Sequence, residues 1–225
     1  MASALSLENV YLTLNSHAGP VEILKGVSFH ARAGEAIGII GPSGSGKTSL
    51  LMVASGLEAA TKGRVEAAGF DLTGKSESQL AQFRRDRIGI IFQSFHLIPT
   101  MTALENVAVP LEFKGVSDAF VRAEAALKRV GLGHRLTHYP SQLSGGEQQR
   151  VAIARAVAAG AQILLADEPT GNLDQETGAA IIELLFELKD KDGATLLLVT
   201  HDRELANKCS RILHVRDGLV SEDAA

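Results

Sequence analysis

One eight-residue loop, Gly41-Pro42-Ser43-Gly44-Ser45-Gly46-Lys47-Thr48, constrains the fold of this 225-residue chain more than any other stretch. A short apolar run at residues 36–40 comes directly before the loop and is typical of a buried strand. Apolar residues at helical spacing follow it, from Lys47 to Leu57. A strand, a glycine-rich loop and a helix in this order predict a P-loop, and with it an α/β fold.

The residue types in this loop suit the binding of a polyphosphate. Gly41, Gly44 and Gly46 let the backbone adopt strained angles and approach a phosphate closely. Successive N–H groups then form an anion-binding nest at the N-terminus of a helix. We expect Lys47 to reach the β- and γ-phosphates of a nucleotide and the Thr48 hydroxyl to bind Mg²⁺. All eight residues of the loop are therefore candidate nucleotide-binding residues.

Composition and charge narrow the class of protein. Hydrophobic residues make up 45% of the chain and charged residues 21%, which is normal for a globular domain. The formal net charge is −4 and there is no basic cluster, so we expect no nucleic-acid partner. No apolar run approaches the roughly 18 residues of a membrane span, and no signal peptide is visible. We expect a cytoplasmic chain that needs another chain to act at a membrane.

Hydrophobic patterning predicts the order of the elements. Expected strands cover residues 6–14, 21–31, 36–40, 63–71 (as a hairpin), 87–93, 162–166 and 195–200, with a closing hairpin at 211–215 and 219–220. Expected helices cover residues 47–57, 76–84, 102–113, 117–130, 145–158, 176–189 and 202–209. Gly19-Pro20 predicts a turn between the first two strands, which we expect to pair antiparallel.

Near-continuous apolar strands that alternate with helices imply a parallel sheet covered on both faces. Residues 95–159 depart from this pattern because they carry helical periodicity and little strand signal. We therefore predict a single α/β domain over residues 1–225, with a P-loop NTPase (RecA-like) core at 1–94 and 160–225. Its sheet is expected to be mixed and mostly parallel, with an N-terminal antiparallel part and an inserted helical subdomain at 95–159.

A second pattern places carboxylates next to the P-loop. The apolar run Ile163–Ala166 ends in Asp167 and Glu168, so both carboxylates should lie at the carboxyl edge of the sheet. Asp167 suits Mg²⁺ binding, directly or through water. Successive side chains at the end of a strand diverge, so Glu168 is expected to point away from Asp167 and to polarise a water for attack on a γ-phosphate.

The stretch Leu143-Ser144-Gly145-Gly146-Glu147 is the most discriminating part of the sequence. Taken alone it predicts a helix start, with Ser144 as the N-cap and Glu147 completing a capping box. In the same chain as a P-loop it resembles the signature of the ATP-binding cassette (ABC) ATPases. The resemblance covers essentially the whole chain, because the motifs occur in the order and at the spacing of that family.

This resemblance implies roles for further residues. Gln93 is similar to the family's mobile glutamine, which senses Mg²⁺ and the attacking water. His201 is similar to the switch histidine that contacts the γ-phosphate. Asp174 ends a stretch, Gly171–Asp174, that is similar to the loop crossing the dimer interface. Ser144, Gly145 and Gly146 would close over the ATP held by the P-loop of a second copy, so a homodimer around two ATP is expected.

The segments 92–107 and 167–174 resemble the branch that serves lipoprotein release, macrolide export and cell-division complexes. Within this branch the chain is most similar to the YbbA-type ATPases, through Phe95–Thr100, Ser141–Arg150 and Asp174–Gly178. Members of this branch work with a membrane permease and drive mechanical work. The resemblance places the permease contact at Phe95–Ile98, although ordinary core packing would also explain these apolar residues. It implies a location on the cytoplasmic face of the inner membrane, through that permease.

One position departs from the family pattern. Members usually stack adenine on an aromatic side chain ahead of the P-loop, and Leu14 occupies that position here. Tyr11 lies three residues earlier, which reverses the face of a strand. The adenine is therefore expected either on an aliphatic surface or on Tyr11 through a shifted strand register.

Together these patterns predict an ATPase subunit that converts ATP and water into ADP and phosphate and drives a permease partner. Export or extraction of a hydrophobic or lipid-linked substrate is the expected work. Glu168 would be the catalytic base, with His201 and Gln93 arranging the γ-phosphate and water, while Thr48, Gln93 and Asp167 hold Mg²⁺. The alternative is a regulatory cassette of low turnover in a cell-division or cell-wall remodelling complex. Soluble cassettes acting on DNA or ribosomes, and P-loop kinases, explain fewer of these features.

Overall fold

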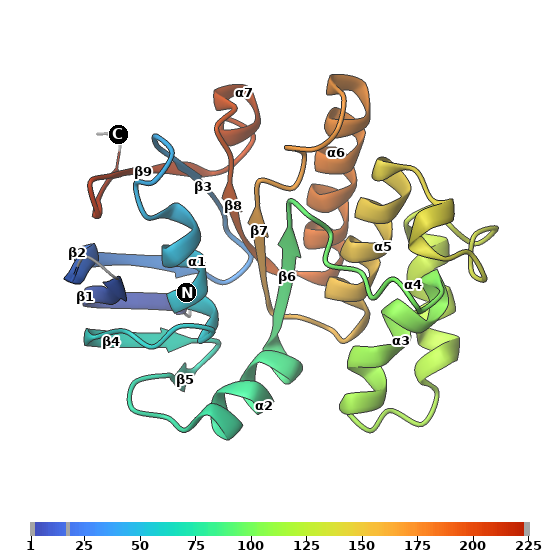
Figure 1. Cartoon of the computed structure of the whole chain (residues 1–225), viewed down its shortest axis with the longest axis horizontal. Coiled ribbons are helices and arrows are strands. Elements are labelled where there is room, and N and C mark those ends of the chain that lie inside the picture. The colour runs from blue at the N-terminus through green and yellow to red at the C-terminus, as the bar shows by residue number, and fades with distance from the viewer. Residues whose placement is uncertain (1–2, 17–18, 223–225) are drawn as a thin grey trace. The chain divides into compact units, whose positions relative to one another are not determined.

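The computed structural model describes residues 3–16 and 19–222. The chain divides into two compact units (Figure 1). The first contains residues 1–84 and 193–225, and the second contains residues 85–192. Each unit is built around its own strands and helices.

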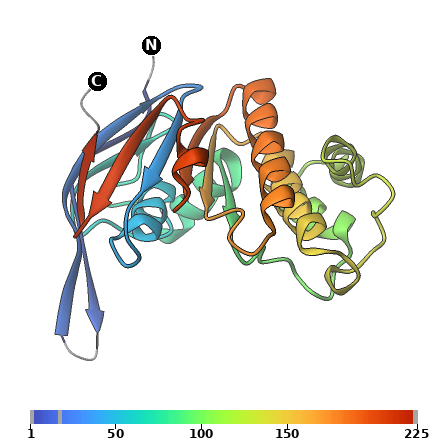
Figure 2. The ribbon, with the colours of Figure 1, turned by 90° about the horizontal axis from the view of Figure 1, so that it is seen from above.

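An antiparallel sheet of four strands opens the first unit. It contains β1 (Ser3–Ser16), β2 (Gly19–Arg32), β4 (Lys62–Ala67) and β5 (Phe70–Asp71), in the order β2-β1-β4-β5. All three neighbouring pairs are antiparallel, which confirms the predicted N-terminal part and the predicted hairpin at residues 63–71. The far end of the β1–β2 hairpin projects from this unit (Figure 2).

The turn predicted at Gly19-Pro20 is wrong. Both residues belong to β2, where Gly19 pairs with Ser16 and Pro20 pairs with Asn15. Proline lacks the N–H that a central strand needs, but it is tolerated in an edge strand. Since β2 is the edge of its sheet, Pro20 fits there and the connection lies outside the described residues.

Parallel strands form the second layer of the first unit. β3 (Ala36–Ile40) pairs in parallel with β8 (Thr195–Val199) and with β9 (Arg211–Arg216), and β10 (Leu219–Glu222) returns antiparallel to β9. Every residue of β3 and β8 is buried, as expected for strands covered on both faces. The helices are α1 (Lys47–Ser55), α7 (Arg203–Ala206) and α2 (Glu77–Arg87), whose last three residues enter the second unit.

The helix α7 is shorter than the predicted span of residues 202–209. Asp202 caps its start, because Oδ1 accepts hydrogen bonds from the backbone N–H groups of Glu204 and Leu205. The chain must then enter β9, and the N–H of Ser210 already bonds to the carbonyl of Ala36 at the start of β3, 2.8 Å away. The pairing of β9 with β3 therefore limits the helix to about one turn.

Along the sequence of the second unit, a block of helices separates two parallel strands. Its elements are β6 (Ile88–Phe92), α3 (Ala103–Phe113), α4 (Ala119–Arg129), a 3₁₀ turn at Pro140–Gln142, α5 (Gly145–Ala158), β7 (Ile163–Asp167) and α6 (Gln175–Asp192). β6 and β7 pair directly, with Phe92 opposite Asp167. α5 and α6 lie side by side in both views (Figures 1 and 2). The three helices predicted between these strands are confirmed, while the subdomain limits of 95–159 stay a prediction.

Within the residues that the structure describes, we find no helix with the length and apolar character required to cross a membrane.

Candidate functional site

The P-loop connects β3 to α1 in the first unit. Gly41, Gly44 and Gly46 have φ values of 157°, 76° and 106°, the backbone angles for which glycine was expected. Gly46 is the N-cap of α1. A Cβ atom at Gly46 would lie 3.2 Å from the Ile23 carbonyl oxygen and from Leu24 Cδ2 of β2. The loop therefore packs so closely on β2 that a larger residue would displace it.

The side chain of Lys47 folds back over the loop. Its Nζ donates hydrogen bonds to the carbonyl oxygens of Gly41 and Pro42, each at 2.9 Å. The ammonium group thus lies at the start of the loop, where it would neutralise the charge of an incoming phosphate. Thr48 is exposed one residue further along α1.

The turn between β9 and β10 holds the P-loop through a backbone hydrogen bond. The N–H of Gly218 donates to the carbonyl of Ser45 at 3.2 Å, and the N–H of Lys25 donates to the carbonyl of Gly218 at 2.9 Å. Ser45 is buried, whereas Pro42, Ser43 and Gly44 are exposed. The fold thus holds one side of the loop and leaves the other side accessible.

His201 follows β8 in the same unit and is exposed. Together with Gly41 and Pro42 it lines an open hollow of about 660 Å³. His214 and the two cationic side chains Arg203 and Arg216 line the same hollow, so it carries positive charge beside the start of the P-loop. A hollow of this charge concentrates anions. The structure therefore brings the predicted switch histidine and the P-loop together.

In the second unit, Gln93 and Asp167 lie at the same end of the β6–β7 pair. Gln93 directly follows Phe92, which is paired with Asp167. The Nε2 of Gln93 donates to Asn172 Oδ1 at 3.1 Å, and Asn172 Nδ2 donates to the Gln93 carbonyl at 3.0 Å. Gln93 is thus tied to the loop that precedes α6. Asn172 was not among the residues predicted to form the site.

Glu168 has a strained backbone. Its φ of 48° lies in the left-handed region, which a residue with a side chain rarely adopts. The carbonyl of Glu168 accepts a hydrogen bond from the N–H of Gly171 at 3.0 Å, which closes the following turn. Asp167 and Glu168 are both half-buried. Strain of this kind gathers at functional sites, which agrees with the role predicted for Glu168.

Ser144 begins the signature helix α5 through the predicted capping box. Its Oγ accepts from the Glu147 N–H at 3.2 Å, and its own N–H donates to Glu147 Oε2 at 2.8 Å. The bond from the Ser144 backbone, followed by Arg135, holds the pKa of Glu147 below its usual value. Glu147 is therefore a carboxylate at neutral pH, and it occupies the N-terminal turn where negative charge is favourable.

The start of α5 packs against the start of α6. A Cβ atom at Gly146 would lie 2.5 Å from Thr177 Cγ2, and one at Gly145 would lie 3.2 Å from Leu173 Cδ2. Asp174 accepts from the Thr177 hydroxyl at 2.6 Å and from the Thr177 N–H at 2.9 Å, and these bonds lower the pKa of Asp174. Only residues without a side chain let the two helix starts approach in this way.

The predicted site residues thus form one group in each unit. The first unit brings His201 to the P-loop, residues 41–48. The second unit joins Gln93 to the 171–174 loop and that loop to Gly145, and it places Asp167 beside Gln93.

The donors predicted for Mg²⁺ have suitable chemistry. Thr48, Gln93 and Asp167 offer a hydroxyl, an amide and a carboxylate oxygen, which are hard donors. Across residues 3–16 and 19–222 there is no group of three or more His, Cys, Asp or Glu side chains that could hold a metal. Mg²⁺ usually binds through one or two carboxylates together with substrate phosphates.

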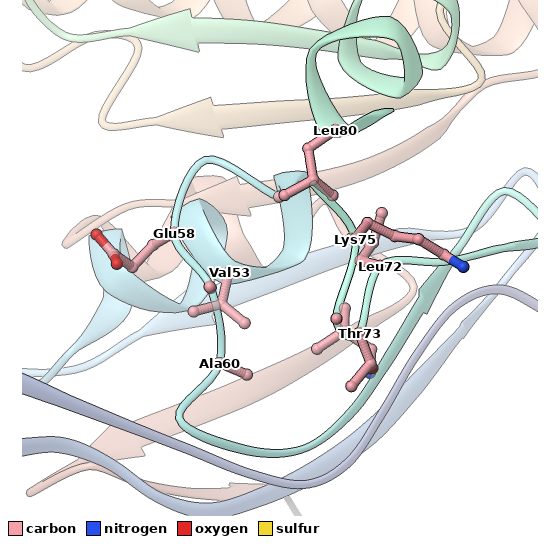
Figure 3. Close-up of a pocket in the computed structure, with 11 residues that line it drawn as sticks. Val53, Glu58, Ala60, Leu72, Thr73, Lys75 and Leu80 are labelled. Atoms are coloured by element: carbon pink, nitrogen blue, oxygen red, sulfur yellow. The ribbon is translucent and has the colours of Figure 1, made fainter. Parts of the chain in front are cut away.

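A second cavity, of about 180 Å³, lies elsewhere in the first unit (Figure 3). Val53, Leu72 and Leu80 turn apolar atoms toward it, while the charged ends of Glu58 and Lys75 extend away from its centre (Figure 3). Its cationic side chain, Lys75, lies with Nζ 5.6 Å from the centre of the Phe70 ring rather than pointing into the cavity. The hollow beside the P-loop is therefore the better candidate for nucleotide chemistry.

Comparison with known proteins agrees with this geometry. Residues 24–171 match the family model described as ABC transporter. The chain is 48% identical over 206 residues to the ABC transporter ATP-binding protein YbbA of Escherichia coli, covering 91% of this chain and 90% of that protein. The lipoprotein-releasing system ATP-binding protein LolD of Acinetobacter baylyi is 45% identical, with 96% of each chain covered.

Two further similarities extend this result. The macrolide export ATP-binding/permease protein MacB of Shigella flexneri is 42% identical over 97% of this chain and 34% of that protein. The dimeric structure of the ATP-binding cassette MJ0796 with ADP and Pi matches with a TM-score of 0.89 and 40% identity. That match covers 98% of this chain and 99% of the other.

The fold and the site define an ATP-binding cassette of the ABC type, which is a class of ATPase. The chain belongs to the ABC transporter family, with YbbA, LolD and MacB among its relatives. The predicted α/β P-loop NTPase fold is confirmed, as is the predicted resemblance to the lipoprotein-release and macrolide-export branch.

Proposed function

We propose that this chain is the ATP-hydrolysing subunit of an ABC transporter or mechanotransmission complex. Two copies would close around two ATP and drive a membrane permease that exports or extracts a hydrophobic or lipid-linked substrate. The observation that carries the proposal is the pairing, in one chain, of a cationic P-loop with a signature helix capped by Ser144. The printed names of the relatives, which include a lipoprotein-releasing system and a macrolide export protein, support the branch.

In this mechanism the P-loop binds and orients the phosphates. The backbone N–H groups of the loop, which Pro42 lacks, and the Lys47 ammonium would hold the β- and γ-phosphate oxygens, because both carry positive charge. Lys47 would exchange its two carbonyl partners, Gly41 and Pro42, for phosphate oxygens. His201 would contact the γ-phosphate from the edge of the same hollow.

The remaining residues would act on water and metal. Glu168 would accept a proton from the water that attacks the γ-phosphate. Gln93 would leave Asn172 and present its amide to that water. Thr48, Gln93 and Asp167 would hold Mg²⁺, which when bound supplies positive charge against the phosphate oxygens. Ser144, Gly145, Gly146 and Asp174 would complete the site of the second copy.

The register of the β1–β2 hairpin supports an aliphatic surface for the adenine. Leu14 pairs with Val21. The register shifts between Leu12 and Thr13, but the extra residue, Ile23, is on β2, so successive residues of β1 still alternate and Leu14 shares the face of Leu12. Leu12 pairs with Leu24, whose side chain abuts the P-loop at Gly46. Leu14 and Val21 are 38% and 45% exposed, so both present apolar atoms on the P-loop side.

Tyr11 is engaged on the other face. Its hydroxyl lies over Gly26, 2.9 Å from where a Cβ atom of that residue would be, and Lys62 Nζ is 6.0 Å from the centre of its ring. This arrangement favours Leu14 over Tyr11 as the contact for the base.

The substitution Glu168→Gln tests the proposed function. The variant should bind ATP with nearly wild-type affinity, because no phosphate contact is lost, but it should hydrolyse ATP at least about a hundredfold more slowly, as loss of a general base does. It should also accumulate as an ATP-bound dimer in gel filtration. Glu183→Gln, an exposed carboxylate on α6, is the matched control and should turn over normally. Hydrolysis by Glu168→Gln at the wild-type rate would refute the assignment.

A further inference from the structure

Two consecutive residues after Gln93 have an unfavourable backbone conformation. Phe95 and His96 have φ values of 59° and 48°, in the left-handed region. Neither is glycine, and side chains make this region costly. A pair in succession persists only where the surrounding structure fixes it. Something in the second unit must therefore hold the segment that carries Gln93.

Arg155 of α5 holds this pair. Its Nη2 donates to the Phe95 carbonyl at 2.8 Å and its Nη1 donates to the His96 carbonyl at 2.6 Å. A guanidinium group presents its donors in a rigid plane, so it fixes two neighbouring carbonyls at once. The ammonium group of a lysine cannot reproduce this geometry. The contact is therefore specific for arginine.

This contact costs free energy, because it removes part of a charged group from water. Burial lowers the pKa of Arg155, since its charge is removed from water. Arg155 makes no ion pair with any described residue, so neutral carbonyls alone compensate for that burial. A half-buried cation without a carboxylate partner adds little to stability. A role in positioning explains the presence of Arg155 better than a role in stability.

The segment is also held at its Gln93 end. Asn172 bonds to both the carbonyl and the side chain of Gln93. Arg155 and Asn172 thus fix residues 93–96 at its two ends. Only the Asn172 contact involves the Gln93 amide, so that contact can break while Arg155 keeps the backbone in place.

We propose that Arg155 is a positioning residue for Gln93: by clamping the left-handed pair Phe95–His96 it sets where the Gln93 amide is presented, and it couples this setting to the signature helix. The inference rests on the proposed function, in which Gln93 meets the attacking water. Ser144 and Arg155 are on one helix, eleven residues and about 16 Å apart. A shift of that helix at Ser144 would therefore be transmitted to Gln93.

The substitutions Arg155→Met and Arg155→Lys test this clamp. Both should lower kcat by at least about tenfold, since two hydrogen bonds to a charged group are lost or distorted. The KM for ATP should change less than about twofold, since Arg155 is not among the residues proposed to bind phosphate. The Mg²⁺ concentration for half-maximal activity should rise, because Gln93 is a proposed ligand. Hydrogen exchange of residues 92–99 should accelerate at least about tenfold, with or without nucleotide.

Lys114→Met is the matched control. Lys114 also donates to two backbone carbonyls of the second unit, those of Ala159 at 2.8 Å and Asp86 at 3.5 Å. Its loss should lower the melting temperature but leave the exchange of residues 92–99 and the kcat unaltered. If Lys114→Met and Arg155→Met alter exchange and kcat alike, Arg155 has only a general structural role and the proposal fails.

A rescue variant separates positioning from packing. Glycine adopts a φ of 48° without strain. Adding His96→Gly to the Arg155→Met variant should therefore restore part of the kcat and of the exchange protection that Arg155→Met loses. Absence of rescue on both measurements would overturn the proposal. A wild-type protein that does not hydrolyse ATP would instead refute the proposed function, and the exchange measurements would still decide whether the clamp exists.

Discussion

Ser144 has one role that the structure shows and one that we propose. It caps α5 through a hydrogen bond from the Glu147 N–H, and it is expected to contact the ATP of the partner copy. Thr102 provides a rare internal comparison, because it caps α3 with the same reciprocal bonds to Glu105. The two caps share their chemistry, so a difference between the variants isolates the second role of Ser144.

Ser144→Ala and Thr102→Ala should each destabilise the chain by about 1 kcal/mol, the usual cost of losing an N-cap. Ser144→Ala should in addition lower ATPase activity at least about tenfold and weaken the ATP-dependent dimer, because it removes a donor to the γ-phosphate. Urea denaturation and steady-state ATPase assays measure the two effects. Equal ATPase rates in the two variants would show that Ser144 is a cap and nothing more.

The sequence predicts residues whose role depends on the type and spacing of side chains. It does not predict residues whose role depends on contacts with the backbone. The spacing of Ser144 and Glu147 predicts a capping box, and the structure confirms it. Arg155 and Asn172 act on carbonyl groups, which every residue possesses, so no pattern marks their targets. The positive φ of Glu168 is likewise invisible in sequence, because it follows from the turn closed by Gly171.

At the scale of elements, the β1–β2 hairpin was predicted in type but not in detail. The alternating pattern of both strands gave their antiparallel pairing, which is confirmed. The pattern did not reveal that β2 has extra residues at Gly26 and Ile23, where the register with β1 shifts. Such bulges depend on cross-strand packing, which local sequence does not encode. They decide which side chains face the P-loop.

Leu14→Tyr tests the adenine contact that this register supports. Stacking of a base on an aromatic ring contributes about 1–3 kcal/mol, so the variant should bind ATP at least about fivefold more tightly. Thr13→Tyr is the control, because residue 13 points to the opposite face of β1 and should leave the affinity unaltered. Fluorescence titration with a labelled ATP analogue measures both. An unchanged affinity in Leu14→Tyr would place the base elsewhere.

At the scale of the whole molecule, the order of elements was predictable because strands and helices differ in hydrophobic period. The helices between β6 and β7 interrupt the strand pattern, and this alone identified them. The compact units divide the chain near residues 84 and 192, which hydrophobic period does not mark. Both limits fall at or near the ends of helices, where no change of composition signals that the chain passes from one unit to the other.

In the proposed complex, the loop after Gln93 would couple the ATPase subunit to the permease. Asn106, which is 1% exposed, fixes this loop: its Oδ1 accepts from the Ile98 N–H at 2.7 Å, and its Nδ2 donates to the Ile98 and Met101 carbonyls. Ile98 itself is 37% exposed, so a rigid backbone presents an apolar side chain outward. This agrees with the permease contact predicted at Phe95–Ile98.

Reconstitution with the cognate permease tests that contact and the function together. The permease should raise the ATPase rate at least several-fold, and Ile98→Asp should abolish this stimulation, because burying a carboxylate in an apolar contact is costly. Phe113→Asp is the control, since Phe113 is 75% exposed at the end of α3 and should keep the stimulation. A low rate that the permease does not raise would favour the regulatory cassette. Loss of stimulation in both variants would show that the effect is not specific to Ile98 and would contradict the predicted contact, because a specific docking site must distinguish two exposed apolar side chains.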